Sequence, residues 1–190
     1  MIREIVTIGH PVLRERAREI TADELAGAPM QQLIEDLVDT MRDANGAGIA
    51  ANQVGEAVRV TVIEVNNNPR YPYKPPIPLT VLINPVIEPI TDEQFVVNEG
   101  CLSVPNLRGD VSRFVSVRVR YLDRDGTQHD EIKRGLTAGT FQHECDHLDG
   151  KLFVDRVTDS TTFTTWEQFE RFHRAAFVER ITAFVERVGS

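Results

Sequence analysis

The chain has 190 residues, with 41% hydrophobic and 26% charged residues and a formal net charge of −8 at pH 7. This length suffices for one domain with a buried core, and we expect residues 1–190 to form a single catalytic domain. The negative charge argues against a nucleic-acid-binding surface, and neither an apolar leader nor a run long enough to span a membrane is present. Two cysteines cannot build a disulfide framework, so we expect a cytoplasmic protein.

The N-terminal part of the sequence predicts one amphipathic helix and one strand. Thr21 opens a capping-box sequence, and apolar residues recur at three- and four-residue spacing between positions 33 and 41. We expect the helix to begin at Thr21 or near Pro29 and to end at Gly46. Residues 58–65 alternate and are rich in β-branched side chains, which predicts a half-buried strand.

Residues 66–78 contain five prolines, which excludes a helix and a hydrogen-bonded ladder. We interpret this segment as a long surface loop. The alternative is a mobile flap whose aromatic side chains, Tyr71 and Tyr73, border a substrate cleft. Further strands are expected at residues 81–90 and 95–98.

The C-terminal part predicts a hairpin and two helices. Residues 113–123 alternate between apolar and polar side chains, and after a turn residues 127–134 form the returning strand. A helix is expected from 136 to 148, followed by a strand-like run at 151–154. An apolar stripe then predicts a C-terminal helix over about residues 164–188, for which core packing is the expected role and a membrane-surface or partner contact the alternative.

The helix expected at 136–148 carries an H-E-x-x-H sequence, which runs from His143 to His147. The two histidines are one turn apart and share a face, so both imidazoles can bind one metal ion. Glu144 lies beside that face, within reach of a water on the metal, whereas Cys145 points away. The pattern alone is moderately specific and can occur by chance.

A catalytic site with two histidine ligands needs a third protein ligand and one open position. Asp149 is too near in sequence to fold back onto the same face, and no further histidine follows at short spacing. The better candidate lies upstream at Cys101, although a small buried cysteine is the alternative. A thiolate with two imidazoles suits Fe(II), Zn(II), Co(II) or Ni(II).

Three sequence blocks, taken together, resemble the signature motifs of the peptide deformylases. Gly46–Gln53 matches G-x-G-x-A-A-x-Q, Glu99–Ser103 matches E-G-C-L-S, and His143–His147 matches H-E-x-D-H, in the order of the family. The resemblance covers residues 10–154, and Asn52 stands where the family more often has Pro or Thr. It implies an α+β fold with antiparallel sheets surrounding a central metal-binding helix and with a C-terminal helix outside.

The resemblance implies a metal-dependent hydrolase that removes the formyl group from N-formylmethionine at the N-terminus of newly made proteins and releases formate. It assigns one divalent ion per chain to Cys101, His143 and His147, with ferrous iron as the usual ion and zinc, nickel or cobalt as alternatives. Glu144 becomes the general base, while the Gln53 amide and the Leu102 backbone N–H stabilise the oxyanion. The substrate-binding residues implied are Gly48, Ile49, Glu99, Gly100 and Arg108.

The resemblance also implies roles for residues around these groups. Glu99 is expected to pair with Arg113, and Asp146 to orient a neighbouring group rather than bind the metal. Gly139 and Thr140, with Ile49, are expected to line the pocket for the first substrate side chain. Arg108 is expected at the rim of the cleft.

Two other classes of protein are alternatives to a deformylase. A zinc endopeptidase would take its third ligand downstream of His147, and a non-catalytic relative would lack Gln53, Cys101 or Glu144. A structural metal site would need a fourth protein ligand, for which only Cys145 is near. The partners expected are N-formylmethionyl nascent peptides and, transiently, the ribosome.

Overall fold

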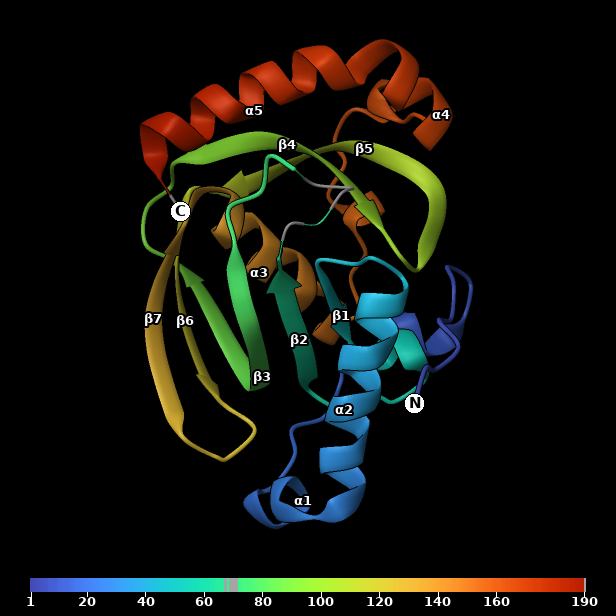
Figure 1. Ribbon diagram of the computed structural model, residues 1–190, viewed down its shortest axis with the longest axis vertical. Helices are drawn as coiled ribbons and strands as arrows, with labels where there is room; N and C mark the ends of the chain where they lie inside the picture. The colour runs from blue at the N-terminus through green and yellow to red at the C-terminus, as the bar shows by residue number, and fades with distance from the viewer. Residues whose placement is uncertain (67, 69–71, 190) are drawn as a thin grey trace.

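The computed structural model describes residues 1–66, 68 and 72–189. A single helix, α3 (Gly135–Leu148), lies inside the molecule between a five-stranded sheet and a two-stranded sheet, and a long C-terminal helix crosses the outer face of the smaller sheet (Figure 1). The expected α+β architecture around a central helix is confirmed. In the described ranges, no helix combines the length and the apolar content that a bilayer crossing requires.

The larger sheet is antiparallel, in the strand order β1-β2-β3-β6-β7. Its strands are β1 (Gly48–Ala50), β2 (Val60–Val65), β3 (Ile77–Pro89), β6 (Ser116–Leu122) and β7 (Gln128–Arg134). The expectation that β2 is half-buried is wrong, because both of its faces are covered. Val60 and Val62 pack in the cluster that contains helix α2, whereas Ile63 and Val65 pack in the cluster that contains Phe141 of α3.

The smaller sheet is a hairpin of β4 (Gln94–Cys101) and β5 (Val104–Phe114). Its register pairs Glu99 with Gly109 and Gly100 with Arg108, and it shifts between Gly100 and Cys101. The sequence predicts no strand over residues 104–112. The strand β5 nevertheless begins at residue 104, because its backbone completes the ladder that holds β4 beside α3.

A helix begins at each of the two positions expected near the N-terminus. Thr21 caps the short helix α1 (Ala22–Ala26), and Glu24 completes the capping box by accepting from the Thr21 backbone N–H at 2.8 Å. A second helix, α2 (Ala28–Asp43), follows directly, with Pro29 in its first turn. The apolar face of α2 packs against β1 and β2.

Residues 151–154 do not form the expected strand. Residues Phe153–Asp155 form a 3-10 helix, and the Asp155 carboxylate accepts a hydrogen bond from the Leu152 backbone N–H at 2.7 Å. This local bond satisfies a donor that a strand would have used in a ladder. Leu152 and Phe153 pack against β5 through Val104 and Val111.

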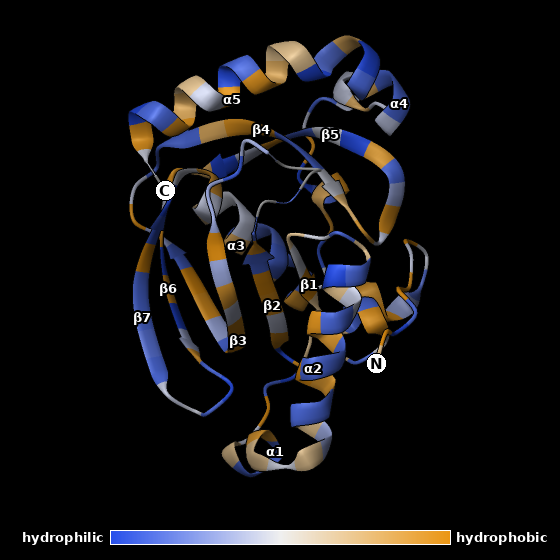
Figure 2. Ribbon diagram, in the orientation of Figure 1, coloured by the Kyte–Doolittle hydropathy of each residue, from blue (hydrophilic) through white to orange (hydrophobic). Residues whose placement is uncertain are grey.

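The expected C-terminal helix is present in three segments: α4 (Trp166–Gln168), a π-helical turn at Phe169–His173, and α5 (Arg174–Val188). Phe177, Ile181 and Phe184 of α5 are buried against β4 and α3, and Figure 2 shows apolar residues on the helix above β4. The expectation of core packing is wrong for two residues of this segment. Phe172 is 63% exposed, and His173 is exposed as well. The wider π-helical turn rotates these two side chains out of the apolar stripe.

Candidate active site

The side chains of Cys101, His143 and His147 converge, with one donor atom of each within 4.8 Å of the others. Cys101 is the last residue of β4, and the two histidines lie one turn apart on α3. The Cys101 Sγ atom is 3.3 Å from His147 Nε2. Cys145 is buried on another side of α3, and burial raises the pKa of its thiol. The sequence therefore identified the three side chains that meet.

The chemistry of this cluster fits a divalent transition-metal ion. A thiolate and two imidazoles are a ligand set that such ions prefer. Burial and the neighbouring His143 lower the pKa of His147, which keeps its imidazole in the neutral form that binds metals. Burial alone would lower the pKa of His143. The contacts with Cys101 and Glu99 outweigh burial and raise this pKa, so these two neighbours favour a positive charge on the His143 imidazole.

A chain of buried ion pairs orients His143. Its Nδ1 lies 2.8 Å from Glu99 Oε2, which turns Nε2 away from Glu99. Arg113 donates to both Glu99 oxygens, at 2.7 and 2.9 Å, and to Asp146 Oδ2 at 2.6 Å. Asp146 is also bonded to Arg156 at 3.1 Å. The expected pairing of Glu99 with Arg113 and the supporting position of Asp146 are both present, and such contacts fix the ring of a metal-binding histidine.

Glu144 is buried beside this cluster, with 5% of its surface exposed. Its Oε2 atom has no hydrogen-bond partner among the residues that the structure describes. Burial raises the pKa of the Glu144 carboxyl to about 7, so both protonation states are accessible at neutral pH. The backbone of Gly48 lies against this side chain, because a Cβ built on Gly48 would be 2.5 Å from Glu144 Cδ.

Gln53 lies beside Cys101. Its Oε1 accepts a hydrogen bond from the Ala50 backbone at 2.9 Å, which fixes the orientation of the amide. Its Nε2 donates to Ser103 Oγ at 3.0 Å and to Cys101 Sγ at 3.6 Å. Gln53 is therefore a preorganised N–H donor next to the candidate metal ligands.

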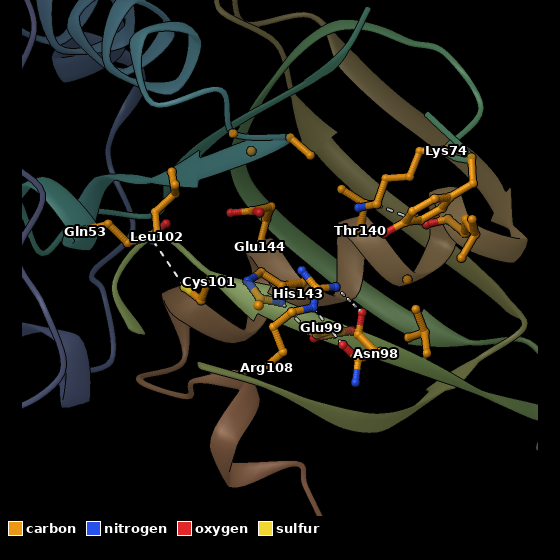
Figure 3. Close-up of a pocket in the computed structure, with 18 residues that line it drawn as sticks. Gln53, Lys74, Asn98, Glu99, Cys101, Leu102, Arg108, Thr140, His143 and Glu144 are labelled. Carbon is orange, nitrogen blue, oxygen red and sulfur yellow. Dashed lines mark hydrogen bonds and ion pairs between the residues drawn. The ribbon is translucent and has the colours of Figure 1, made fainter. Parts of the chain in front are cut away.

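A cavity of about 70 Å³ lies over these groups. Figure 3 shows Gln53, Leu102 and Cys101 at one end of it, and Lys74 with Thr140 at the other, with Glu144 and His143 between. Four of the expected substrate-binding residues are on its wall: Gly48, Glu99, Gly100 and Arg108. Ile49 is not. It is fully buried in the core that packs on α2.

Arg108 lies in the cavity wall as a buried residue rather than at an exposed rim, with 1% of its surface exposed. It donates to the Asn98 side-chain oxygen at 2.7 Å and to the Asn98 backbone oxygen at 2.9 Å. Its guanidinium carbon lies 4.1 Å from the centre of the Trp166 ring and 4.4 Å from that of Phe169. Arg108 thus joins the cavity wall on β4 to the C-terminal segment.

Sequence reasoning missed Lys74 as a residue of the site. Its Nζ donates to Thr140 Oγ1 at 2.9 Å, and burial lowers the pKa of the ammonium to about 8. Its neighbour Tyr73 lines the cavity, as the flap interpretation expected, and packs edge-on against Phe177 with the ring centres 5.1 Å apart. Tyr71 lies outside the described residues. No local pattern marks a single lysine within a proline-rich loop as part of a site.

The chain matches the family model described as polypeptide deformylase over residues 2–163. Peptide deformylase 1 of Prochlorococcus marinus is 42% identical over 189 residues, which span 99% of this chain and 96% of that protein. Peptide deformylase 2 of Ralstonia nicotianae is 44% identical over 171 residues, which span 86% of this chain and 91% of that protein.

The chain is also similar to solved structures of peptide deformylases. The Met-Ala-Ser-bound class I type b peptide deformylase from Acinetobacter baumannii has a TM-score of 0.80 and 38% identity, and covers 83% of this chain and 99% of that one. A peptide deformylase from Synechococcus elongatus in complex with actinonin has a TM-score of 0.74 and 31% identity. This second match covers 98% of the present chain and 86% of that one, so it extends over the C-terminal helix.

Proposed function

The chain belongs to the polypeptide deformylase family, whose members are metal-dependent hydrolases that remove the N-formyl group from nascent peptides, and we propose how its own residues divide that reaction. The observation that carries the proposal is the buried carboxylate of Glu144 beside the cluster of Cys101, His143 and His147, at the wall of one cavity. This arrangement supports a base and a set of metal ligands that act on one bound carbonyl group.

Cys101, His143 and His147 would hold one divalent ion, with ferrous iron as the ion that we propose and zinc, nickel or cobalt as substitutes. When bound, the ion acts as a Lewis acid and lowers the pKa of a water ligand from ~15.7 toward ~7. The Glu99–His143 contact holds the imidazole in the required orientation throughout.

Glu144 moves the proton in both halves of the reaction. It accepts a proton from the attacking water as the new C–O bond forms at the formyl carbon, which requires the ionised carboxylate. It then donates this proton to the amide nitrogen as the C–N bond breaks, so that the peptide leaves with a free amino terminus and the formyl group leaves as formate. A carboxyl whose pKa is raised to about 7 suits both transfers.

The Gln53 side-chain N–H and the Leu102 backbone N–H stabilise the oxygen that becomes negative during the attack. Gln53 is held in place by Ala50, so little reorganisation is needed when charge develops. One donor of this type typically contributes about 3–4 kcal/mol to transition-state stabilisation. The backbone of Gly48 and Gly100 on the cavity wall is proposed to align the peptide.

We further propose that the chain acts as a single catalytic domain in the cytoplasm, on N-formylmethionyl nascent peptides and in transient contact with the ribosome. The membership of the family supports the substrate class. The packing of Phe177, Ile181 and Phe184 against β4 and α3 supports a single domain, because the C-terminal helix and the catalytic helix share one core cluster.

The test is release of formate from formyl-Met-Ala-Ser under anaerobic conditions, with ferrous iron or nickel supplied. The wild type is expected to be active only with metal, and Glu144→Gln to lose several orders of magnitude of turnover while still binding one metal ion. The exposed Glu93→Gln is the matched control and is expected to keep wild-type activity. A wild type that binds metal but releases no formate would refute the assignment, and cleavage within an unformylated peptide would instead identify an endopeptidase.

A further inference from the structure

The cavity has a far end, lined by Lys74 and Thr140, that the formyl group does not use. The reacting carbon must lie near Glu144, with its oxygen toward Gln53 and Leu102 (Figure 3). The remainder of a nascent chain has to leave toward solvent because of its length. The part of the substrate that can reach the far end, toward Lys74 and Thr140, is therefore the side chain of its first residue.

The walls of this end differ in polarity along its depth. Val97 and Leu136 are buried apolar residues, and they suit the methylene groups of a long side chain. Beyond them, the Lys74 ammonium donates to Thr140 Oγ1 at 2.9 Å. The Thr140 hydroxyl in turn donates to the Leu136 backbone oxygen at 3.1 Å, so it faces Lys74 as an acceptor. A first side chain would thus meet apolar walls and then a cation.

The residue next to Lys74 contacts the C-terminal helix. Tyr73 packs edge-on against Phe177 of α5, with the ring centres 5.1 Å apart. Earlier in the chain, the Asn68 side chain donates to the backbone oxygens of Asn45 and Gly46, at 3.0 and 3.2 Å. Tyr73 thereby connects the backbone next to Lys74 to the C-terminal helix, and Asn68 contacts the first glycine of the active-site block.

We propose that Lys74 is a specificity-determining residue that makes this enzyme accept N-formylmethionine sulfoxide at the N-terminus of its substrates. This inference rests on the proposed deformylase function. Methionine sulfoxide keeps the two methylene groups of methionine and adds a strong acceptor oxygen at sulfur. That oxygen reaches the position where the Lys74 ammonium lies and accepts a charge-assisted hydrogen bond from it, beside or in place of Thr140.

A wholly hydrocarbon side chain gains nothing comparable from this end of the cavity. It leaves the contact between Lys74 and Thr140 as it is and adds no hydrogen bond to the ammonium. Methionine lies between the two cases, because its thioether sulfur is only a weak acceptor. The order expected for the first residue is therefore sulfoxide at least equal to methionine, and methionine above norleucine.

The experiment compares kcat/KM for formyl-Met-Ala-Ser, its sulfoxide (each epimer separately) and the norleucine analogue, in the metal-loaded wild type and in Lys74→Met. In the wild type, kcat/KM for one sulfoxide epimer is expected to be at least equal to that for formyl-Met-Ala-Ser and above that for the norleucine analogue. In Lys74→Met the sulfoxide-to-norleucine ratio should fall by about 10- to 100-fold, which is the range for a hydrogen bond to a charged group. Lys74→Arg, which keeps the cation, should retain a larger ratio than Lys74→Met.

Lys151→Met is the matched control, because Lys151 is exposed and lies outside the cavity, and its ratio should equal that of the wild type. A ratio unchanged in Lys74→Met would overturn the proposal. If Lys74→Met fails to fold, the wild type decides alone: a higher kcat/KM for the norleucine analogue than for both sulfoxide epimers overturns the proposal. Absence of activity on formyl-Met-Ala-Ser itself would instead count against the deformylase function.

Discussion

Arg113 is the residue on which the geometry of the metal site most depends. It lies on β5, pairs with Glu99 on β4 and with Asp146 on α3, and is itself only 3% exposed, with both carboxylates 10% exposed. Arg113→Met keeps most of the volume of the side chain and removes the charge. Asp146 retains Arg156, but Glu99 then lies buried with His143 as its remaining partner. Removal of one partner from a buried ion pair costs about 3–5 kcal/mol, and this is the loss of unfolding free energy that we expect at pH 7.

Arg118→Met is the matched control. Arg118 makes the same kind of two-bond contact across an antiparallel strand pair, at 2.7 and 2.5 Å to Asp130, but these side chains are 51% and 43% exposed. Exposed pairs contribute about 0–1 kcal/mol. Urea unfolding of the metal-free proteins, followed by circular dichroism, measures both losses. A loss in Arg113→Met that is within about 1 kcal/mol of that in Arg118→Met would refute the reasoning.

The pH dependence of the unfolding free energy tests the same prediction in a second way. Burial alone would raise the pKa of Glu99, but Arg113 and His143 outweigh it and hold the pKa below its usual range. The stability that this carboxylate contributes is therefore present above the unfolded pKa of about 4.3 and is lost as pH falls toward the folded value. Without Arg113 the pKa of Glu99 rises, so protonation relieves the buried charge. The difference in unfolding free energy between wild type and Arg113→Met should therefore become smaller as pH is lowered below about 4.3.

Three further predictions test other parts of the structure. Gly48→Ala places a Cβ 2.5 Å from Glu144 Cδ, and the displaced carboxylate should lower kcat by about 100-fold while metal content, measured by mass spectrometry, stays at the wild-type level. Phe141→Ala removes a fully buried ring between α3 and the larger sheet and should cost about 3–5 kcal/mol in urea unfolding, whereas Phe172→Ala, at a ring that is 63% exposed, should cost far less. Glu24, whose pKa is lowered to about 2 chiefly by its hydrogen bond from Arg18, stabilises the fold above pH 4.5 and progressively less toward pH 2, so the melting temperatures of wild type and Glu24→Gln should converge as pH falls through that window.

The sequence predicted the centre of the site because local periodicity and chemistry coincide there. The helical spacing of His143 and His147 requires both rings to share a face, and the structure places them so, with Cys101 beside them. The alternation of residues 113–123 likewise predicted β6 and its partner, since a strand with one solvated face leaves a period of two.

The parts that the sequence did not predict depend on contacts between distant segments. Lys74 enters the cavity because Tyr73 packs against Phe177, about a hundred residues away along the chain. Arg108 is buried because Trp166 and Phe169 cover it, and an isolated arginine gives no sign of such a partner. The apolar stripe predicted over residues 164–188 does not continue through the exposed Phe172, where a π-helical turn changes the phase of the helix.

The measurement that tests the central claim most directly is a paired determination of bound metal and of formate release in wild type, Cys101→Ser and Glu144→Gln. We expect one metal ion per chain with turnover in the wild type, strongly weakened metal binding with little turnover in Cys101→Ser, and one metal ion without turnover in Glu144→Gln. Full turnover in Glu144→Gln, or an undiminished metal affinity in Cys101→Ser, would contradict this claim.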